Sequence, residues 1–93
     1  VFLPQMKVPV KPPITGLVIC KNEAKHINAC VRALQACCAE VLVADTGSTD
    51  ATLELAQKSG ARLIHLPWEG YAQTKNKAAT QAQYDWILSV DAD

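Results

Sequence analysis

The sequence predicts an α/β fold, an open and mainly parallel sheet of about four strands joined by helical crossovers. Two features of the chain predict it. Short, nearly continuous apolar runs alternate with segments in which apolar residues recur at helical spacing. The runs do not alternate between apolar and polar residues, which is typical of strands that are covered on both faces of a parallel sheet.

The first strand and helix follow a leader. Residues 1–13 are rich in proline, so we expect an extended segment there. Residues 14–20 form a short apolar run and predict the first strand. Asn22 is a good N-cap for the helix that we expect next. The apolar positions of that helix continue at helical spacing to Cys38 and predict one buried face.

The same alternation then repeats. Residues 41–44 predict a second buried strand that ends at Asp45, and either Ser48 or Thr49 can cap the helix after it. Gly60 is the expected stop of that helix, because glycine readily adopts the left-handed conformation at a helix C-terminus. The remaining expected elements are a strand over 62–66, an alanine-rich helix over 71–82 and a strand over 84–90.

Length and charge exclude several classes of protein. The 93 residues suffice for one small domain, and the formal net charge of zero gives no basic field that would collect nucleic acid. No segment has the ~20 apolar residues needed to span a bilayer. The four cysteines form no Cys-x-x-Cys pair, so we interpret them as small buried hydrophobic residues. Unpaired thiols fit a reducing cytoplasm, where we expect the protein.

Polar segments follow three of the expected strands, at 21–23, 45–50 and 91–93. In open parallel sheets ligands bind outside the carboxyl ends of the strands, so these segments should converge on one cleft. Asp91 and Asp93 are two residues apart at a strand end, where their carboxylates can point the same way and suit Mg²⁺ or Mn²⁺. An isolated Asp-x-Asp is more often solvated, and it is the convergence that favours a metal site.

Each polar segment also has a purely structural interpretation. Asn22 and Glu23 suit the start of a helix, and a lysine such as Lys75 usually lies on a solvated helix face. Good turn and cap residues explain 46–50, but they leave Asp45 unexplained. Its carboxylate can accept a hydrogen bond from a base N–H or a ribose hydroxyl. We consider the structural and the functional interpretation of this turn equally supported.

Trp68 and Tyr71 flank Gly70 in the loop before the third expected helix. An aromatic lid over a ligand and an anchored loop both fit this arrangement, and we favour the anchored loop. His65 closes a strand and is interpreted as structural. The Gly-x-Gly-x-x-Gly, Walker and Gly-x-Ser-x-Gly motifs do not occur, which argues against ordinary dehydrogenases, ATPases and hydrolases.

The order of the motifs resembles that of a known family. Residues 21–23 follow the first strand, 45–50 the second, 67–71 precede a helix that carries 75–76, and 85–93 close the chain on Asp-x-Asp. This order resembles the Rossmann-like, nucleotide-binding half of family 2 glycosyltransferases with the GT-A fold. It is most similar to the bacterial branch that adds β-linked glucose to the lipopolysaccharide inner core.

The resemblance covers residues 14–93 and implies a nucleotide-sugar donor, UDP-glucose. By matching motifs, Asn22 and Glu23 would line the nucleoside pocket, and Asp45 would accept from the uracil N–H. Lys75 stands where relatives often have arginine, which keeps the charge but loses a bidentate phosphate contact. These positions are the nucleotide-sugar-binding residues that the resemblance assigns, together with Asp91.

The resemblance also implies a metal and a reaction. Asp91 would approach the ribose or the metal, and Asp93 would bind the Mg²⁺ or Mn²⁺ that bridges the diphosphate. The family inverts the anomeric centre with a carboxylate base that lies after Asp-x-Asp, so no catalytic base is assigned. We therefore expect residues 14–93 to be the donor-binding half only, inactive alone. The implied acceptor is a glycan or lipid-linked lipopolysaccharide core, and the implied location is the inner face of the membrane, with peripheral association.

Two other functions remain open. A non-catalytic nucleotide- or metal-binding module from a truncated gene would carry the same motifs. A nucleotidyltransferase would be expected to have a glycine- and arginine-rich loop after the first strand, which residues 21–23 are not. We also expect the isolated chain to self-associate, because the apolar run 86–90 would expose sheet surface.

Overall fold

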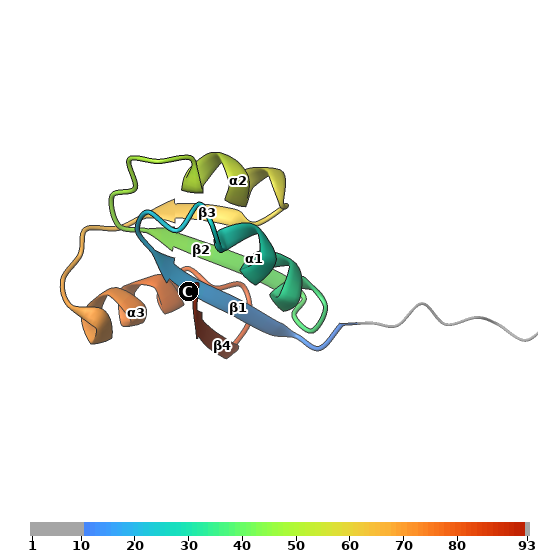
Figure 1. Cartoon of the computed structure of the whole chain (residues 1–93). Coiled ribbons are helices and arrows are strands. Elements are labelled where there is room, and N and C mark those ends of the chain that lie inside the picture. The colour runs from blue at the N-terminus through green and yellow to red at the C-terminus, as the bar shows by residue number, and fades with distance from the viewer. Residues whose placement is uncertain (1–10, 93) are drawn as a thin grey trace, which may run out of the picture.

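The computed structural model describes residues 11–92 of the chain. The expected leader falls mostly outside this range and stays a prediction, and Asp93 lies outside the described residues as well. The elements alternate in the expected way (Figure 1): β1 Ile14–Cys20, α1 Ile27–Gln35, β2 Glu40–Asp45, α2 Thr52–Lys58, β3 Arg62–His65, α3 Tyr71–Thr80 and β4 Trp86–Asp91.

The strands form one four-stranded sheet in the order β3-β2-β1-β4. All three pairings are parallel, which confirms the predicted fold class. The register aligns Cys20 of β1 with Asp45 of β2, and Ile19 of β1 with Asp91 of β4. The carboxyl ends of β1, β2 and β4 therefore lie together at one edge of the sheet.

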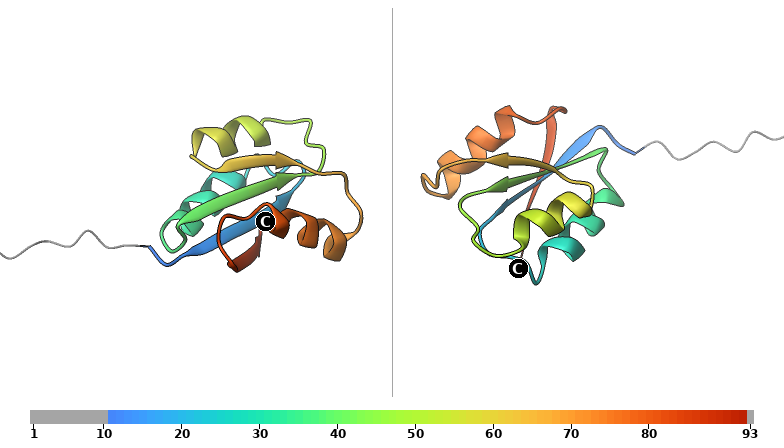
Figure 2. Two further views of the ribbon diagram at one scale, coloured as in Figure 1. Left: turned by 180° about the vertical axis from the view of Figure 1, so that it is seen from behind. Right: turned by 90° about the horizontal axis from the view of Figure 1, so that it is seen from above.

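Helices cover both faces of the sheet. Helices α1 and α2 lie on one face and α3 lies on the other, as the view from above in Figure 2 shows. The buried residues form one cluster on each face. The cluster under α1 and α2 includes Val18, Cys20, Ile27, Val31, Leu34, Val43 and Ala56. The cluster under α3 is smaller and comprises Leu17, Leu42, Ala44 and Ala78.

Helix α1 lies close to β1 because Gly16 has no side chain. A Cβ atom at Gly16 would lie 3.1 Å from Leu34 Cβ and 3.2 Å from Cys38 Sγ. Cys20 and Cys38 are buried, as expected of small hydrophobic residues. The expectation is wrong for Cys37, which is exposed because α1 ends at Gln35 and the chain then turns away.

The predicted helix caps are wrong, whereas the predicted helix stop is right. Helix α1 begins only at Ile27, and Asn22 instead adopts a left-handed conformation with φ of 54° in the loop before it. Helix α2 begins after Ala51, so neither Ser48 nor Thr49 caps it. Both loops bond to each other instead of to the helices that follow them. Gly60 ends α2 with φ of +93°, as expected.

Candidate functional site

The loops after β1 and β2 are held together by cross-bonds at the carboxyl edge. The Asn22 backbone N–H donates to Ser48 Oγ at 2.9 Å, and the Thr49 N–H donates to Asn22 Oδ1 at 2.7 Å. The Thr46 N–H donates to the Cys20 carbonyl at 3.0 Å, and the Thr46 hydroxyl donates to the same carbonyl at 3.1 Å. The Asn22 amide therefore fixes the position of the neighbouring loop.

A second set of bonds joins the same loops nearer to α2. Thr52 is buried, and its hydroxyl accepts from the Glu23 N–H at 2.9 Å. Asp50 accepts from the Thr52 N–H at 3.0 Å and from the Ala24 N–H at 3.3 Å. The hydrogen bond from the Thr52 hydroxyl is the main cause of a pKa of Asp50 below its ordinary value. Asp50 is therefore ionised and holds both loops.

Asp45 is buried at the centre of its own loop, with 2% of its surface exposed. Its Oδ2 accepts from the Gly47 N–H at 3.0 Å and the Ser48 N–H at 2.9 Å, and its Oδ1 accepts from the Ser48 hydroxyl. Burial by itself would raise the pKa of Asp45, but these hydrogen bonds and the nearby His65 hold that pKa below its ordinary value. The Asp45 carboxylate therefore stabilises the turn after β2, a structural role that the sequence alone did not indicate.

Cys20 shares the buried environment of Asp45. Its Sγ lies 3.8 Å from Asp45 Oδ1. Burial, followed by the negative charge of Asp45 and the hydrogen bond to it, raises the pKa of Cys20 to about 12. The thiol is therefore neutral and acts as a small buried group, because only the thiolate is a nucleophile.

Asp45 and Asp91 lie at one edge of the sheet but on opposite faces. Asp45 contacts Cys20, which belongs to the cluster under α1 and α2. Asp91 lies two residues after Ser89, whose hydroxyl is 3.4 Å from the Tyr71 hydroxyl of α3. Since strand side chains repeat every two residues, the Asp91 side chain is expected on the α3 side. Its backbone carbonyl accepts from Cys30 Sγ of α1 at 3.9 Å, so the residue also borders the groove beside α1. The rule that ligands bind at a sheet edge does not by itself distinguish these faces.

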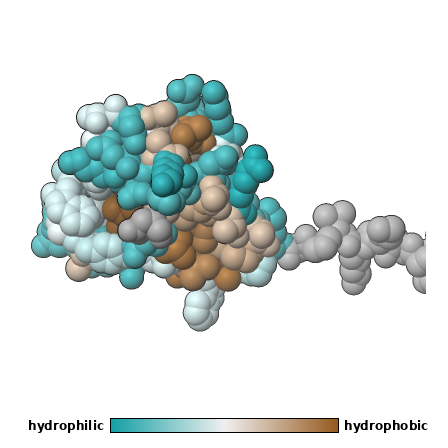
Figure 3. All heavy atoms as spheres, in the orientation of Figure 1, coloured by the Kyte–Doolittle hydropathy of each residue, from teal (hydrophilic) through white to brown (hydrophobic). Residues whose placement is uncertain are grey.

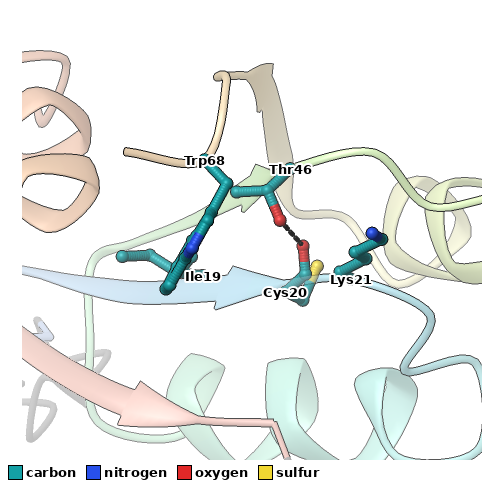
Figure 4. Close-up of a pocket in the computed structure, with 5 residues that line it drawn as sticks. All are labelled: Ile19, Cys20, Lys21, Thr46 and Trp68. Carbon is teal, nitrogen blue, oxygen red and sulfur yellow. Dashed lines mark hydrogen bonds between the residues drawn. The ribbon is translucent and has the colours of Figure 1, made fainter. Parts of the chain in front are cut away.

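A cavity of about 350 Å³ opens at the carboxyl edge between the ends of β1 and β2 and the loop after β3. It is lined by Ile19, Cys20, Lys21, Thr46 and Trp68, drawn in Figure 4. Asp91 is the neighbour of Ile19 in the register of β1 and β4. An exposed carboxylate thus lies one strand away from the cavity.

The other sequence-predicted residues lie on different elements or outside the described range. Glu23 is half-buried in the loop after β1, and Lys75 is half-buried on α3. Asp93 lies outside the described residues, and within residues 11–92 no group of three metal-ligating side chains occurs. Carboxylates such as that of Asp91 are the ligands that Mg²⁺ and Mn²⁺ prefer. Sequence reasoning did not single out Ile19 and Thr46, because an apolar strand residue and a turn threonine carry no signal of a cavity.

A protein-family model described as "Glycosyl transferase family 2" matches residues 17–93 of the chain. The chain belongs to glycosyl transferase family 2. The motif order after β1, β2 and β4 is therefore that of a family member, and the resemblance read from the sequence is confirmed.

Several curated relatives of this family 2 chain are glycosyltransferases. An uncharacterized glycosyltransferase of Rickettsia bellii is 40% identical over 80 residues, covering 86% of the chain and 27% of the relative. The lipopolysaccharide core biosynthesis glycosyltransferase LpsC of Rhizobium meliloti is 38% identical over 88 residues, covering 89% of the chain and 32% of LpsC. The family 2 chain thus spans about a third of the length of LpsC.

Solved structures share the fold. Glucosyl-3-phosphoglycerate synthase of Mycobacterium tuberculosis, in complex with Mn²⁺, UDP and phosphoglyceric acid, has a TM-score of 0.74 at 25% identity, covering 87% of this chain and 33% of the synthase. The same enzyme with Mn²⁺, UDP and glucosyl-3-phosphoglycerate has a TM-score of 0.77 at 24% identity, again covering 87% and 33%. In the described part of the family 2 chain, no helix has the length and apolar character to cross a membrane.

Proposed function

We propose that this chain is the donor-binding part of a glycosyltransferase. The enzyme would transfer glucose from a UDP-sugar to a glycan or lipopolysaccharide core acceptor. The observation that carries the proposal is the cavity at the carboxyl edge, one strand away from the Asp91 carboxylate. Relatives support the substrate class, because LpsC is a lipopolysaccharide core enzyme and the mycobacterial synthase is crystallised with UDP and Mn²⁺.

Asp91 and Asp93 are the proposed ligands of the Mg²⁺ or Mn²⁺. Asp91 is exposed at the end of β4, and two carboxylates suit a hard divalent cation. The bound cation would supply Lewis-acid stabilisation of the diphosphate leaving group. An inverting reaction also needs a base that deprotonates the acceptor hydroxyl. We assign that base to no residue of the 93.

The nucleoside end of the donor is proposed to lie against the loops after β1 and β2. Glu23 offers a carboxylate in the loop after β1 and Lys75 offers a cation on α3, both half-buried. Asn22 and Asp45 already accept hydrogen bonds from the two loops. A carboxylate offers about four lone-pair sites, and those of Asp45 already accept from the Gly47 and Ser48 N–H groups, the Ser48 hydroxyl and the Cys20 thiol. Contact with a uracil N–H would therefore have to replace one of these bonds.

Self-association of the chain through β4 is proposed as a further property. The outer edge of β4 carries no paired strand in the described sheet, and Trp86 and Leu88 are 72% and 42% exposed. Beside β4 lies a groove of about 510 Å³ against α1, lined among others by Ala29, Cys30, Ala33, Val90 and Ala92. Figure 3 shows apolar residues gathered below α1 on this side. Pairing of β4 with β4 of a second copy would satisfy both strand edges.

Calorimetry with UDP tests the proposed donor site. We expect the chain to bind UDP weakly with Mn²⁺ or Mg²⁺. Asp93→Asn should reduce the affinity by roughly tenfold or more, because even the replacement of a residue that only orients a metal ligand reduces metal affinity by that factor. Asp85→Asn removes an exposed carboxylate at the other end of β4 and serves as the matched control. Equal UDP affinity with and without the metal would refute the metal site.

A further inference from the structure

The cavity at the carboxyl edge has one flat aromatic wall. Figure 4 shows the Trp68 side chain reaching from the loop after β3 to Ile19 on β1, with Thr46, Cys20 and Lys21 to one side of it. Trp68 is 58% exposed although the cavity beside it is largely apolar. The result is a slot with an apolar floor, an aromatic wall and polar groups at its rim.

Trp68 does not anchor its own loop. Leu66 fixes the beginning of the loop, because its N–H donates to the Asp45 carbonyl at 3.0 Å. Glu69 fixes the end, because its N–H donates to Thr74 Oγ1 at 3.0 Å and its carboxylate pairs with Lys77 Nζ at 2.6 Å. An anchoring tryptophan would be buried, whereas Trp68 is presented to solvent between two fixed points. The loop is anchored, and its aromatic side chain is left available for a ligand.

We propose that Trp68 stacks on the pyrimidine base of the nucleotide donor and forms one wall of the base subsite. Planar bases stack favourably on indole, and the loops at 21–26 and 46–51 contain no phenylalanine, tyrosine or tryptophan. This inference rests on the proposed donor-binding function and adds the residue that grips the base.

The positions of the groups set the direction of the donor across the sheet. The slot lies over the ends of β1 and β2, and Asp91 lies on β4, beside Ile19 on the far side of β1. Adjacent strands are about 5 Å apart. A nucleoside diphosphate with its base against Trp68 therefore extends toward Asp91, so that the diphosphate reaches the carboxylates at the end of β4.

The two tryptophans of the chain allow a direct test by fluorescence. The Trp86→Phe variant keeps Trp68 alone, and the Trp68→Phe variant keeps Trp86, which lies at the amino end of β4. Titration with UDP and Mg²⁺ should change the emission of Trp68 in a saturable way and leave that of Trp86 unchanged. Unchanged Trp68 emission, while calorimetry detects UDP binding to the same sample, would overturn the proposal.

Affinity supplies the second readout. Trp68→Ala should weaken UDP binding about tenfold, within the range of base stacking on aromatic residues, and Trp68→Phe should restore most of it. Binding of inorganic pyrophosphate with Mg²⁺, which lacks a base, should be the same in Trp68→Ala and in the parent chain. If UDP affinity survives Trp68→Ala, the stacking role is refuted and donor binding stands. If the parent chain binds no UDP, both proposals are refuted.

Discussion

The two parts of the carboxyl edge are built in opposite ways. In the loops after β1 and β2 the polar side chains are already hydrogen-bonded within the protein. Asn22, Asp45 and Asp50 all accept hydrogen bonds from neighbouring backbone N–H groups. The end of β4 and the loop after β3 instead present Asp91 and Trp68 to solvent. We call the hydrogen-bonded loops after β1 and β2 the frame. The end of β4 and the loop after β3 offer exposed side chains instead.

This difference teaches that a polar residue at a sheet edge is not by that fact a ligand contact. Asp45 and Asp91 both end apolar strands, and the sequence gives them similar surroundings. Only the structure shows that Asp45 is 2% exposed and bonded within its turn, whereas Asp91 is exposed on the other face. The frame positions the free groups, and a binding site needs both.

Breaking the frame should have the largest effect on stability. Asp45→Asn replaces a buried acceptor of three hydrogen bonds by an amide that cannot satisfy all three donors. We expect the free energy of unfolding to fall by about 1.5–3 kcal/mol, the range for hydrogen bonds to a charged group. Urea denaturation measures this, with the exposed Asp85→Asn as the control. Equal stability of the two variants would contradict the account of the frame.

The frame should also weaken in acid. The pKa of Asp45 is lower in the folded chain than its ordinary value of about 3.9, so its contribution is complete above that pH and is lost as the pH falls through the folded value. Between about pH 5 and pH 3 the free energy of unfolding should therefore decline. The decline should be shallower in Asp45→Asn, as urea titrations at several pH values would show. Parallel declines in the two proteins would assign the acid sensitivity to other groups.

The smallest effect is expected at the open side of the molecule. Pairing of two β4 edges buries a small interface, which is typical of weak association. Light scattering at increasing concentration should detect self-association, and Leu88→Lys should abolish it, because a lysine on an edge strand opposes pairing. Gln57→Lys adds the same charge on the exposed face of α2 and should leave association unchanged. A parent chain that stays monomeric throughout would rule out the proposed contact.

Most of the fold could be predicted from the sequence, because the spacing of apolar residues distinguishes the strands from the helices. The run 14–20 is observed as β1 with the expected bounds, and helix α3 starts at Tyr71 as expected. The helix starts could not be predicted. Asn22 and Thr49 are good cap residues for the helices that follow, yet they bond to each other's loops across 27 residues of sequence. Capping preferences are local, and this contact is tertiary.

The convergence of the strand ends was predictable to a similar degree. The meeting of strand ends followed from the rule for parallel sheets, and it is confirmed by the pairing of β1 with β2 and β4. The face on which each side chain lies depends on the register, as the opposite placement of Asp45 and Asp91 shows. The exposure of Trp68 depends on how Leu66 and Glu69 tie its loop down, and a sequence motif carries no information on that.

The central claim is that the donor binds in the cavity at the carboxyl edge, and amide chemical-shift mapping by NMR tests it most directly. Addition of UDP and Mg²⁺ should move the backbone signals of the residues that line the cavity, namely Ile19, Lys21, Thr46 and Trp68. Signals from the groove between α1 and β4, such as those of Ala29 and Ala33, should stay in place. Shifts confined to that groove, or no shifts at all, would contradict the account.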